Sequence, residues 1–141
     1  GALRTKLGFD RGFDIVASAA EVLHVEGLRV GAVGFCWGGS VAFLANTRLG
    51  LPAVSYYGAR TVPFLDEALR APMMFHFGQL DKSIPAETVE LHRQKQPRAQ
   101  VHVYAGADHA FNRDADNHVF HADHARTAWQ RTVEFLGENL R

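Results

Sequence analysis

The only cysteine of the chain stands where a catalytic nucleophile could stand. Cys36 lies in the segment GFCWG at residues 34–38, which has the G-x-S-x-G spacing of a nucleophile elbow with cysteine in place of serine. The turn would place Cys36 at the N-terminus of the following helix, where the helix dipole favours a thiolate. The backbone N–H of Trp37 would face a developing oxyanion. Taken alone, the segment also permits an inert thiol in a core, because free cysteines are usually small buried hydrophobes.

Two further polar residues supply the base and acid that such a nucleophile needs. Asp81 stands in GQLDKSIP and His109 stands in AGADHAF. A histidine can act as general base, and an aspartate can orient it. Taken one at a time, Asp81 would be interpreted as a turn residue and His109 as a surface loop residue. The chain order of Cys36, Asp81 and His109, however, is that of the α/β-hydrolase triad. Asp108 is rejected as the acid, because a neighbour in sequence cannot readily reach the distal imidazole nitrogen.

The apolar patterning predicts a scaffold that brings these residues together. Short apolar runs are typical of parallel strands buried on both faces, and we expect strands over residues 28–35, 53–57, 72–77 and 100–104. Between them we expect helices over residues 12–26, 40–49, 85–96 and 116–140. Alternating strands and helices predict an open parallel α/β sheet, whose chemistry lies in loops beyond the carboxyl ends of the strands. Cys36, Asp81 and His109 each follow an expected strand.

The first and last helices each show one apolar face. The face of the first is formed by Ile15, Val16, Ala19, Ala20, Val22 and Leu23. The stripe of the last is formed by Ala125, Trp129, Val133, Leu136 and Leu140.

Composition bounds the class of protein. The 141 residues are 47% hydrophobic and 21% charged, which is typical of one globular domain. The net charge of zero argues against a nucleic-acid partner, which needs clustered excess Lys and Arg. No apolar stretch approaches the roughly 18 residues that span a bilayer. With a single cysteine and no signal-peptide pattern, we expect a cytoplasmic protein without a membrane or disulfide framework.

Other histidines are expected to be structural. A metal site is conceivable near the start of the last helix, where three histidines are spaced three apart: His118, His121 and His124. Asp116 and Asp123 lie nearby, but steps of three and six drift around a helix and no cysteine assists, which favours a solvated face. His76 and His102 lie within expected strands and are interpreted as packed or edge residues. We therefore expect no metal and no other cofactor.

Together, these motifs resemble the dienelactone hydrolase, or carboxymethylenebutenolidase, family of α/β-hydrolases. The resemblance rests on GFCWGG, YYG, GQLDKSIP and AGADHAFNR, which occur in order along nearly the whole chain. It implies Cys36 as nucleophile, His109 as base and Asp81 as its orienting acid. It further implies that Arg113 grips a substrate carboxylate, a task that suits a guanidinium fork, and that Trp37 and Tyr57 line the pocket. The other interpretation of Arg113 is an exposed loop residue.

The chain also departs from the family. Some relatives place serine where this chain has Ala110. Members of the family begin with further strands, which supply a glutamate that controls the cysteine, a second carboxylate-binding arginine and another oxyanion N–H. That absent part also pairs with the strand at residues 28–35, which would otherwise present an apolar edge. We expect residues 1–141 to be the C-terminal portion of a longer α/β-hydrolase domain, or else to recruit a partner chain over that edge.

Two classes of function follow. The first is a hydrolase that cleaves a small lactone or ester, with or without a carboxylate, through an acyl-enzyme on Cys36. The second is a catalytically silent fragment or degenerate scaffold that acts as a binding module. A thiol redox sensor is the weakest alternative, because Cys36 has no resolving partner.

Overall fold

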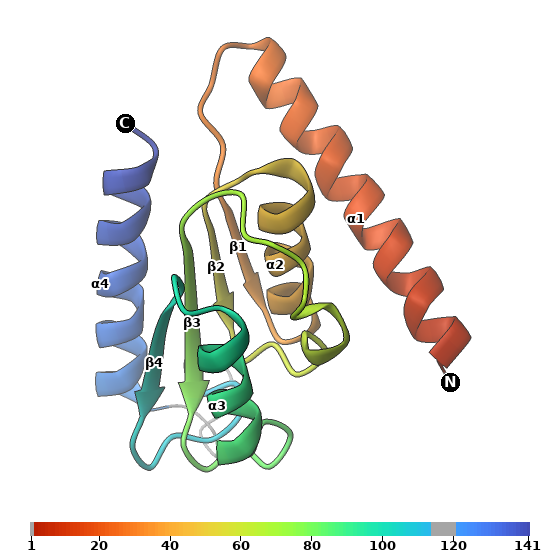
Figure 1. Ribbon diagram of the computed structural model, residues 1–141. Coiled ribbons are helices and arrows are strands. Elements are labelled where there is room, and N and C mark those ends of the chain that lie inside the picture. Colours follow the sequence, from red (N-terminus) through yellow and green to blue (C-terminus); the bar gives the residue numbers. More distant parts are fainter. Residues whose placement is uncertain (1, 114–120) are drawn as a thin grey trace.

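The computed structural model describes residues 2–113 and 121–141, with side chains from residue 8 onward, and shows a four-stranded parallel sheet in the order β1-β2-β3-β4 (Figure 1). The strands are β1 (Ala32–Phe35), β2 (Ala53–Tyr56), β3 (Met73–Gly78) and β4 (Gln100–Tyr104). The helices are α1 (Ala2–Val25), α2 (Trp37–Leu49), α3 (Ala86–Lys95) and α4 (Ala122–Asn139), with a short 3₁₀ turn η1 (Val62–Phe64). The predicted parallel α/β sheet is confirmed.

Among the described residues, the element bounds differ most from the predicted ones at the starts of β1 and α1. β1 begins at Ala32, not at residue 28, because Ala32 already pairs with Ala53 at the start of β2 and the preceding residues have no strand beside them. α1 begins at Ala2, well before the predicted residue 12. Its added turns contain polar residues that a search for apolar periodicity passes over. The predicted start of the last helix, at residues 116–120, lies outside the described residues.

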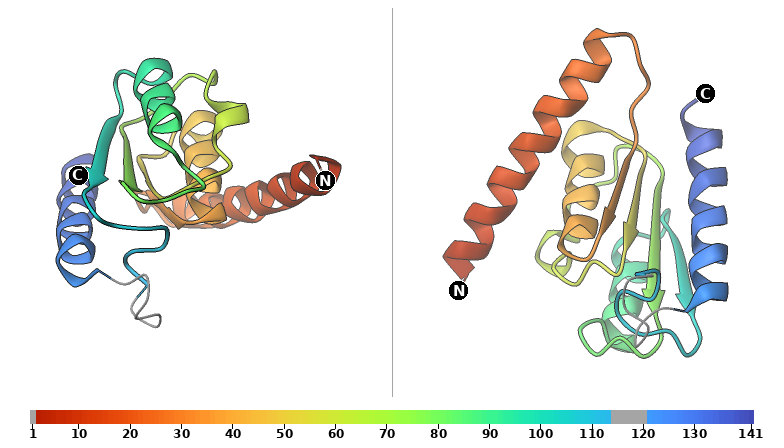
Figure 2. Two further views of the ribbon diagram at one scale, coloured as in Figure 1. Left: turned by 90° about the horizontal axis from the view of Figure 1, so that it is seen from below. Right: turned by 180° about the vertical axis from the view of Figure 1, so that it is seen from behind.

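Helices cover the two faces of the sheet (Figure 2). Side chains alternate along β3: the Phe75 ring contacts Phe43 of α2 and His92 of α3, whereas His76 bonds to Thr132 of α4. α2 and α3 therefore pack on one face and α4 packs on the other, as expected for side chains that point alternately from a strand.

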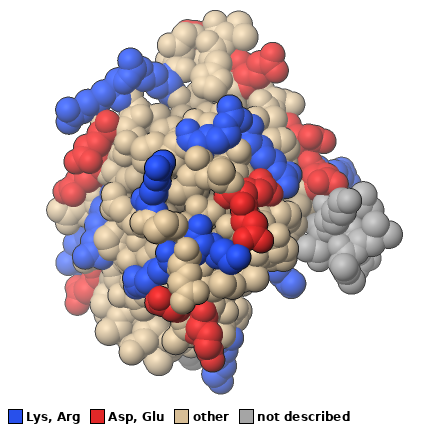
Figure 3. All heavy atoms as spheres, viewed as in Figure 1, with Lys and Arg blue, Asp and Glu red and all other residues tan. Residues whose placement is uncertain are grey.

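The surface shows no membrane-crossing element and no expanse of one charge. No helix among the described residues is long and apolar enough to cross a bilayer. On the face drawn in Figure 3, Lys and Arg are interspersed with Asp and Glu, in keeping with the net charge of zero.

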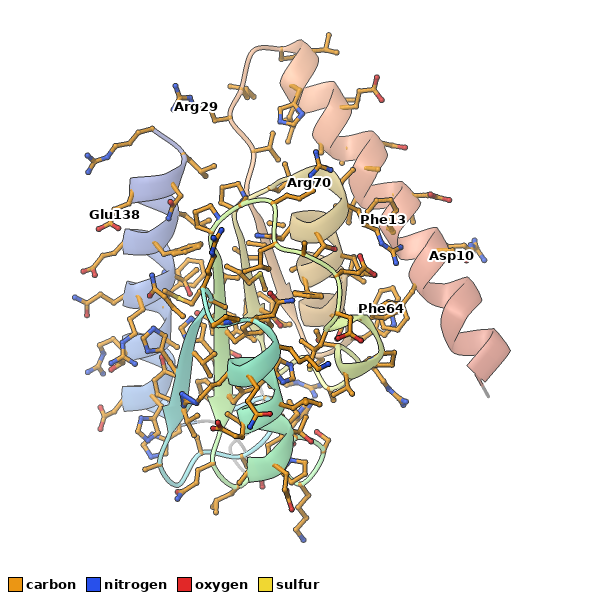
Figure 4. All side chains as sticks on the ribbon, in the orientation of Figure 1. Asp10, Phe13, Arg29, Phe64, Arg70 and Glu138 are labelled. Carbon is orange, nitrogen blue, oxygen red and sulfur yellow. The ribbon has the colours of Figure 1, made fainter. Side chains whose placement is uncertain are left out.

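Aromatic contacts attach α1 to the rest of the molecule. Phe9, which is only 3% exposed, stacks on Trp37 with ring centroids 5.2 Å apart and meets Phe64 of η1 edge-on. The guanidinium of Arg48 lies 5.5 Å from the ring of Phe13 and 5.7 Å from that of Phe64 (Figure 4). The N-terminal half of α1 is therefore tied to both ends of α2, through Trp37 in its first turn and Arg48 in its last.

Much of the predicted apolar face of α1 is not buried. Ala20 is buried and Val16 is half-buried, but the remaining predicted positions are exposed: Ile15, Ala19, Val22 and Leu23. The prediction of one continuous packed face is wrong for these residues, because in the described chain the C-terminal half of α1 packs mainly through Ala20.

α4 packs by a different face from the predicted stripe. Its buried residues are Ala128, Thr132 and Phe135, whereas Trp129 and Val133 are 55% and 50% exposed. The C-terminal end of the stripe does pack close to the start of β1, because a Cβ at Gly31, the residue before β1, would lie 3.1 Å from Leu136 and 3.3 Å from Leu140.

An uncovered apolar face results between α4 and the edge of the sheet. Val33 and Phe35 of β1 are 36% and 42% exposed. Phe35 pairs with Tyr56 and contacts its ring, and the Tyr56 hydroxyl bonds to α4, so both β1 side chains point to the α4 side. We call Val33, Phe35, Trp129 and Val133 the uncovered apolar face.

A buried polar network joins the sheet to α4. His76 is fully buried, with Nδ1 2.9 Å from the Tyr104 hydroxyl and Nε2 3.0 Å from Thr132 Oγ1. Thr132 donates its own proton to the Ala128 carbonyl, so His76 donates from Nε2 and accepts at Nδ1. Half-buried His102 stacks on His76. Both are packed strand residues, as predicted.

The network predicts acid sensitivity. Burial, assisted by neighbouring His102 and Arg131, lowers the pKa of His76 to about 3. An unfolded chain takes up this proton near its ordinary pKa of about 6.5, so between these values the unfolded state binds more protons. The free energy of unfolding should therefore fall as pH is lowered through this window, with a contribution from His76 of up to about 1.4 kcal/mol per pH unit.

We expect His76→Gln to flatten the dependence of unfolding free energy on pH between about 6.5 and 4.5. Denaturant unfolding of the complete protein at several pH values measures this slope, with His24→Gln on exposed α1 as the matched control. The same slope in wild type and His76→Gln would show that His76 does not titrate on unfolding.

Candidate active site

The turn after β1 forces Cys36 into an unusual conformation. Cys36 has φ 55° and ψ −126° and directly precedes the first residue of α2, a region that non-glycine residues occupy only when their surroundings enforce it. Gly34 is needed because a Cβ there would overlap the carbonyl of Gly38. At Gly39, a Cβ would lie 2.6 Å from Ser55 Oγ. The strand–turn–helix geometry expected of a nucleophile elbow is therefore present.

The loop after β3 holds an ordered acid–base pair. Asp81 is 3% exposed, and its Oδ2 lies 2.7 Å from His109 Nδ1. Its Oδ1 accepts the backbone N–H of Ser83 at 2.9 Å and also the Ser83 hydroxyl. Because Nδ1 is directed at the carboxylate, Nε2 of His109 is left as the base.

Asp108 does not compete for this role. Its Oδ1 instead accepts the backbone N–H of His109 at 2.7 Å, which agrees with its rejection as the orienting acid. The two loops meet closely, since a Cβ at Gly78 would lie 2.6 Å from the Ala107 carbonyl oxygen. Neighbouring parallel strands thus deliver Asp81 and His109 to one place.

One cavity of about 540 Å³ brings the three predicted catalytic residues together at the carboxyl ends of the strands. Its lining is formed by Cys36, Trp37, Ala59, Arg60, Asp81, Lys82, Ser83, Asp108 and His109. Sequence reasoning missed Arg60, Lys82 and Ser83. Lys82 and Ser83 directly follow Asp81 in GQLDKSIP, and their neighbourhood to this carboxylate was the signal that could have indicated them. Arg60 follows YYG just after β2, and nothing in its local sequence marks it as part of a site.

The predicted substrate-binding residues occupy different positions. Trp37 lines the cavity while its ring stacks on Phe9, and as first residue of α2 its N–H lacks an intrahelical acceptor. Tyr57 is buried with its ring 5.1 Å from that of His109, but it is not part of the cavity lining. Arg113 is exposed and also lies outside the lining, with its backbone N–H bonded to Ala110.

The electrostatics correct one expectation. Burial raises the pKa of the Cys36 thiol, Arg113 acts to lower it, and Asp81 raises it further. The expectation that the helix N-terminus would favour a standing thiolate is wrong here, because desolvation of the charged form dominates. The burial of Cys36 therefore opposes ionisation of its thiol.

The histidines near α4 form no metal site in the described chain. His121 and His124 stack with centroids 4.0 Å apart, and His124 donates from Nε2 to the Ala105 carbonyl at 2.7 Å. His118 and Asp116 lie outside the described residues. Within residues 2–113 and 121–141, no group of three or more His, Cys, Asp or Glu could hold a metal ion.

Comparisons with known proteins agree with this geometry. The model of the dienelactone hydrolase family matches residues 2–140. The carboxymethylenebutenolidase of Pseudomonas putida is 34% identical over 114 residues, which are 77% of this chain and 48% of that protein. A candidate carboxymethylenebutenolidase of Escherichia coli O157:H7 is 36% identical over 140 residues, with 87% of this chain and 51% of the relative covered.

Solved structures give the same result. A candidate dienelactone hydrolase of Klebsiella pneumoniae superposes with a TM-score of 0.68 at 34% identity, covering 74% of this chain and 50% of that one. The chain thus spans about half the length of the relatives that it matches. Because the family model covers nearly all of the chain and the fold agrees with that of the Klebsiella structure, the chain belongs to the dienelactone hydrolase family of α/β-hydrolases.

Proposed function

We propose that the protein carrying this chain hydrolyses carboxylic esters or lactones through Cys36, His109 and Asp81. The observation that carries the proposal is the 2.7 Å contact between Asp81 Oδ2 and His109 Nδ1, on the wall of the cavity that Cys36 also lines. Family membership supports the reaction class, because the Pseudomonas putida relative is named a carboxymethylenebutenolidase.

The proposed reaction begins with a thiol. Since burial raises the pKa of Cys36, its proton passes to His109 Nε2 as Sγ attacks the acyl carbon. Asp81 holds the imidazole in the required tautomer and stabilises the imidazolium. The N–H of Trp37 stabilises the oxyanion. His109 then protonates the leaving alcohol, and water, activated by the same histidine, releases the acid from Cys36.

Arg113 is proposed to bind a carboxylate on the substrate. It acts on the pKa of both Cys36 and Tyr57, in each case lowering it, so its charge is felt at the nucleophile. A guanidinium can bind both oxygens of a carboxylate at once. Trp37 and Tyr57 would then form the apolar wall beside the reacting ester.

We also propose that polypeptide outside these 141 residues, or a partner chain, covers β1 and the uncovered apolar face. Support comes from the exposure of Val33, Phe35, Trp129 and Val133 and from the coverage of only about half of each relative. Large exposed apolar patches commonly mark surfaces that bind other protein segments. A second oxyanion donor would come from the same covering segment.

The nucleophile is tested directly by Cys36→Ala. We expect kcat/KM for 4-nitrophenyl acetate to fall at least about a thousandfold, because removal of a triad nucleophile abolishes the covalent route. Asp81→Asn should also lose most activity, whereas Asp108→Asn, its matched control, should retain it, since the side chain of Asp108 bonds to the backbone N–H of His109 and not to the imidazole. Steady-state assays of the complete protein measure this, and hydrolysis that survives Cys36→Ala would rule out the mechanism.

Ser83 is expected to position Asp81. Ser83→Ala removes the hydroxyl that bonds to Oδ1 but keeps the backbone N–H. The loss of one hydrogen bond to a charged group should lower kcat by roughly tenfold with little change in KM. Ser83→Thr keeps the hydroxyl and should restore the rate. A defect in KM alone, or no rescue by threonine, would contradict this role.

Amide exchange tests whether β1 is covered. Ala32 and Cys36 donate to β2, so the alternate N–H groups of Val33 and Phe35 point away from it. In the complete protein we expect hydrogen exchange of these two amides to be slow, as in a paired strand. The isolated 141-residue chain is the reference. Exchange as fast in the complete protein as in that reference would show that nothing pairs with β1.

A further inference from the structure

The cavity beside Cys36 carries positive charge that the proposed chemistry does not use. Arg60 and Lys82 both line it, and neither makes an ion pair or side-chain hydrogen bond with any residue that the structure describes. The two carboxylates of the lining are already engaged, Asp81 by His109 and Ser83 and Asp108 by a backbone N–H. Unpaired cations in a concave site attract anionic ligands.

A buried relay ties the backbone of Arg60 to the helix that follows the nucleophile. The N–H of Arg60 donates to Ser40 Oγ at 3.2 Å, and Ser40 Oγ lies 2.8 Å from Thr61 Oγ1. Thr61 in turn donates to the Gly58 carbonyl at 3.4 Å. Ser40 and Thr61 are fully buried. Every hydroxyl in this relay therefore donates once and accepts once, which fixes its direction.

Direct backbone packing reinforces this attachment. A Cβ at Gly58 would lie 3.0 Å from the backbone nitrogen of Ser40, and a Cβ at Gly39 would lie 3.2 Å from the Cα of Gly58. The loop after β2 thus lies against the first turn of α2, with the Ser55 hydroxyl beside both glycines, since a Cβ at Gly58 would also lie 2.8 Å from Ser55 Oγ. The backbone of Arg60 therefore has a fixed position relative to Cys36, and Arg60 is an exposed residue that lines the cavity.

We infer that Arg60 is a specificity-determining residue whose guanidinium binds a carboxylate of the substrate from the β2–η1 side of the cavity. The inference rests on the proposed hydrolase function and deepens it. The planar guanidinium of Arg60, on a backbone that is held in place, suits bidentate binding of a carboxylate. The ammonium of Lys82 is a point charge on a flexible side chain. Arg60 lines the cavity, whereas Arg113, the other guanidinium proposed to bind a carboxylate, lies outside its lining.

The test compares two esters in the complete protein. Arg60→Met should raise KM for 4-nitrophenyl hydrogen succinate at least about tenfold more than KM for 4-nitrophenyl butyrate, because charge-assisted hydrogen bonds are strong. Arg60→Lys should recover part of this difference. Arg29→Met is the matched control, since it removes the same charge from the loop that enters β1, at the opposite end of the sheet (Figure 4).

Lys82→Met and Arg113→Met separate the possible causes. A selectivity loss in Lys82→Met equal to that in Arg60→Met would indicate only a general positive field, and would overturn the inference. Equal KM changes for both esters in Arg60→Met would also overturn it. Arg113→Met tests the other guanidinium: a loss of selectivity for the anionic ester in Arg113→Met, with none in Arg60→Met, would also overturn the inference.

A binding measurement tests the Arg60 inference separately from the proposed hydrolysis. In the Cys36→Ala background, calorimetry should show N-phenylsuccinamate binding at least about tenfold more weakly after Arg60→Met. If the wild-type protein hydrolyses neither ester but this loss is seen, the reaction fails and the carboxylate site stands. If both esters are hydrolysed and Arg60→Met leaves succinamate affinity unaltered, the hydrolase stands and the Arg60 inference fails.

Discussion

The structure depends on the close approach of backbone to backbone around Cys36. The turn from β1 into α2 holds Cys36 at a positive φ, and Gly34 has no space for a side chain beside Gly38. The same tight packing continues through Gly39 to the loop after β2. This close backbone packing places Cys36 at the cavity and lets α2 begin at the following residue. It also fixes the position of the loop that carries Arg60.

The parallel sheet converts chain order into proximity. β3 and β4 are neighbours, so the loops at their carboxyl ends meet, and Asp81 can reach His109 although the two residues are far apart in sequence. The buried carboxylate directs one imidazole nitrogen and leaves the other for proton transfer. Since burial raises the pKa of Cys36, the proposed reaction generates the thiolate as Sγ attacks.

The sequence predicted the architecture, and it predicted that Cys36, Asp81 and His109 follow strand ends and line one site. Both features leave local signals: apolar runs for buried strands, and glycines around a cysteine. It failed where the result depends on what packs against what. Ile15 and Trp129 belong to well-formed apolar stripes and are nevertheless exposed; periodicity shows which residues share a face, but not whether another segment covers it. The pKa of Cys36 was misjudged because desolvation cannot be read from spacing. Arg60 was missed because its relay through Ser40 and Thr61 joins segments that only the fold brings together.

The central claim is that Cys36 forms a covalent acyl-enzyme. Rapid acid quench of the complete protein after mixing with 4-nitrophenyl acetate, followed by peptide mass spectrometry, tests this step directly. An aryl ester has a good leaving group, so the acyl-enzyme should accumulate before it hydrolyses. The account predicts one acetyl group per chain on the peptide that contains Cys36, formed together with a burst of nitrophenol. Turnover with Cys36 unmodified, or with the acetyl group on another residue, would contradict it.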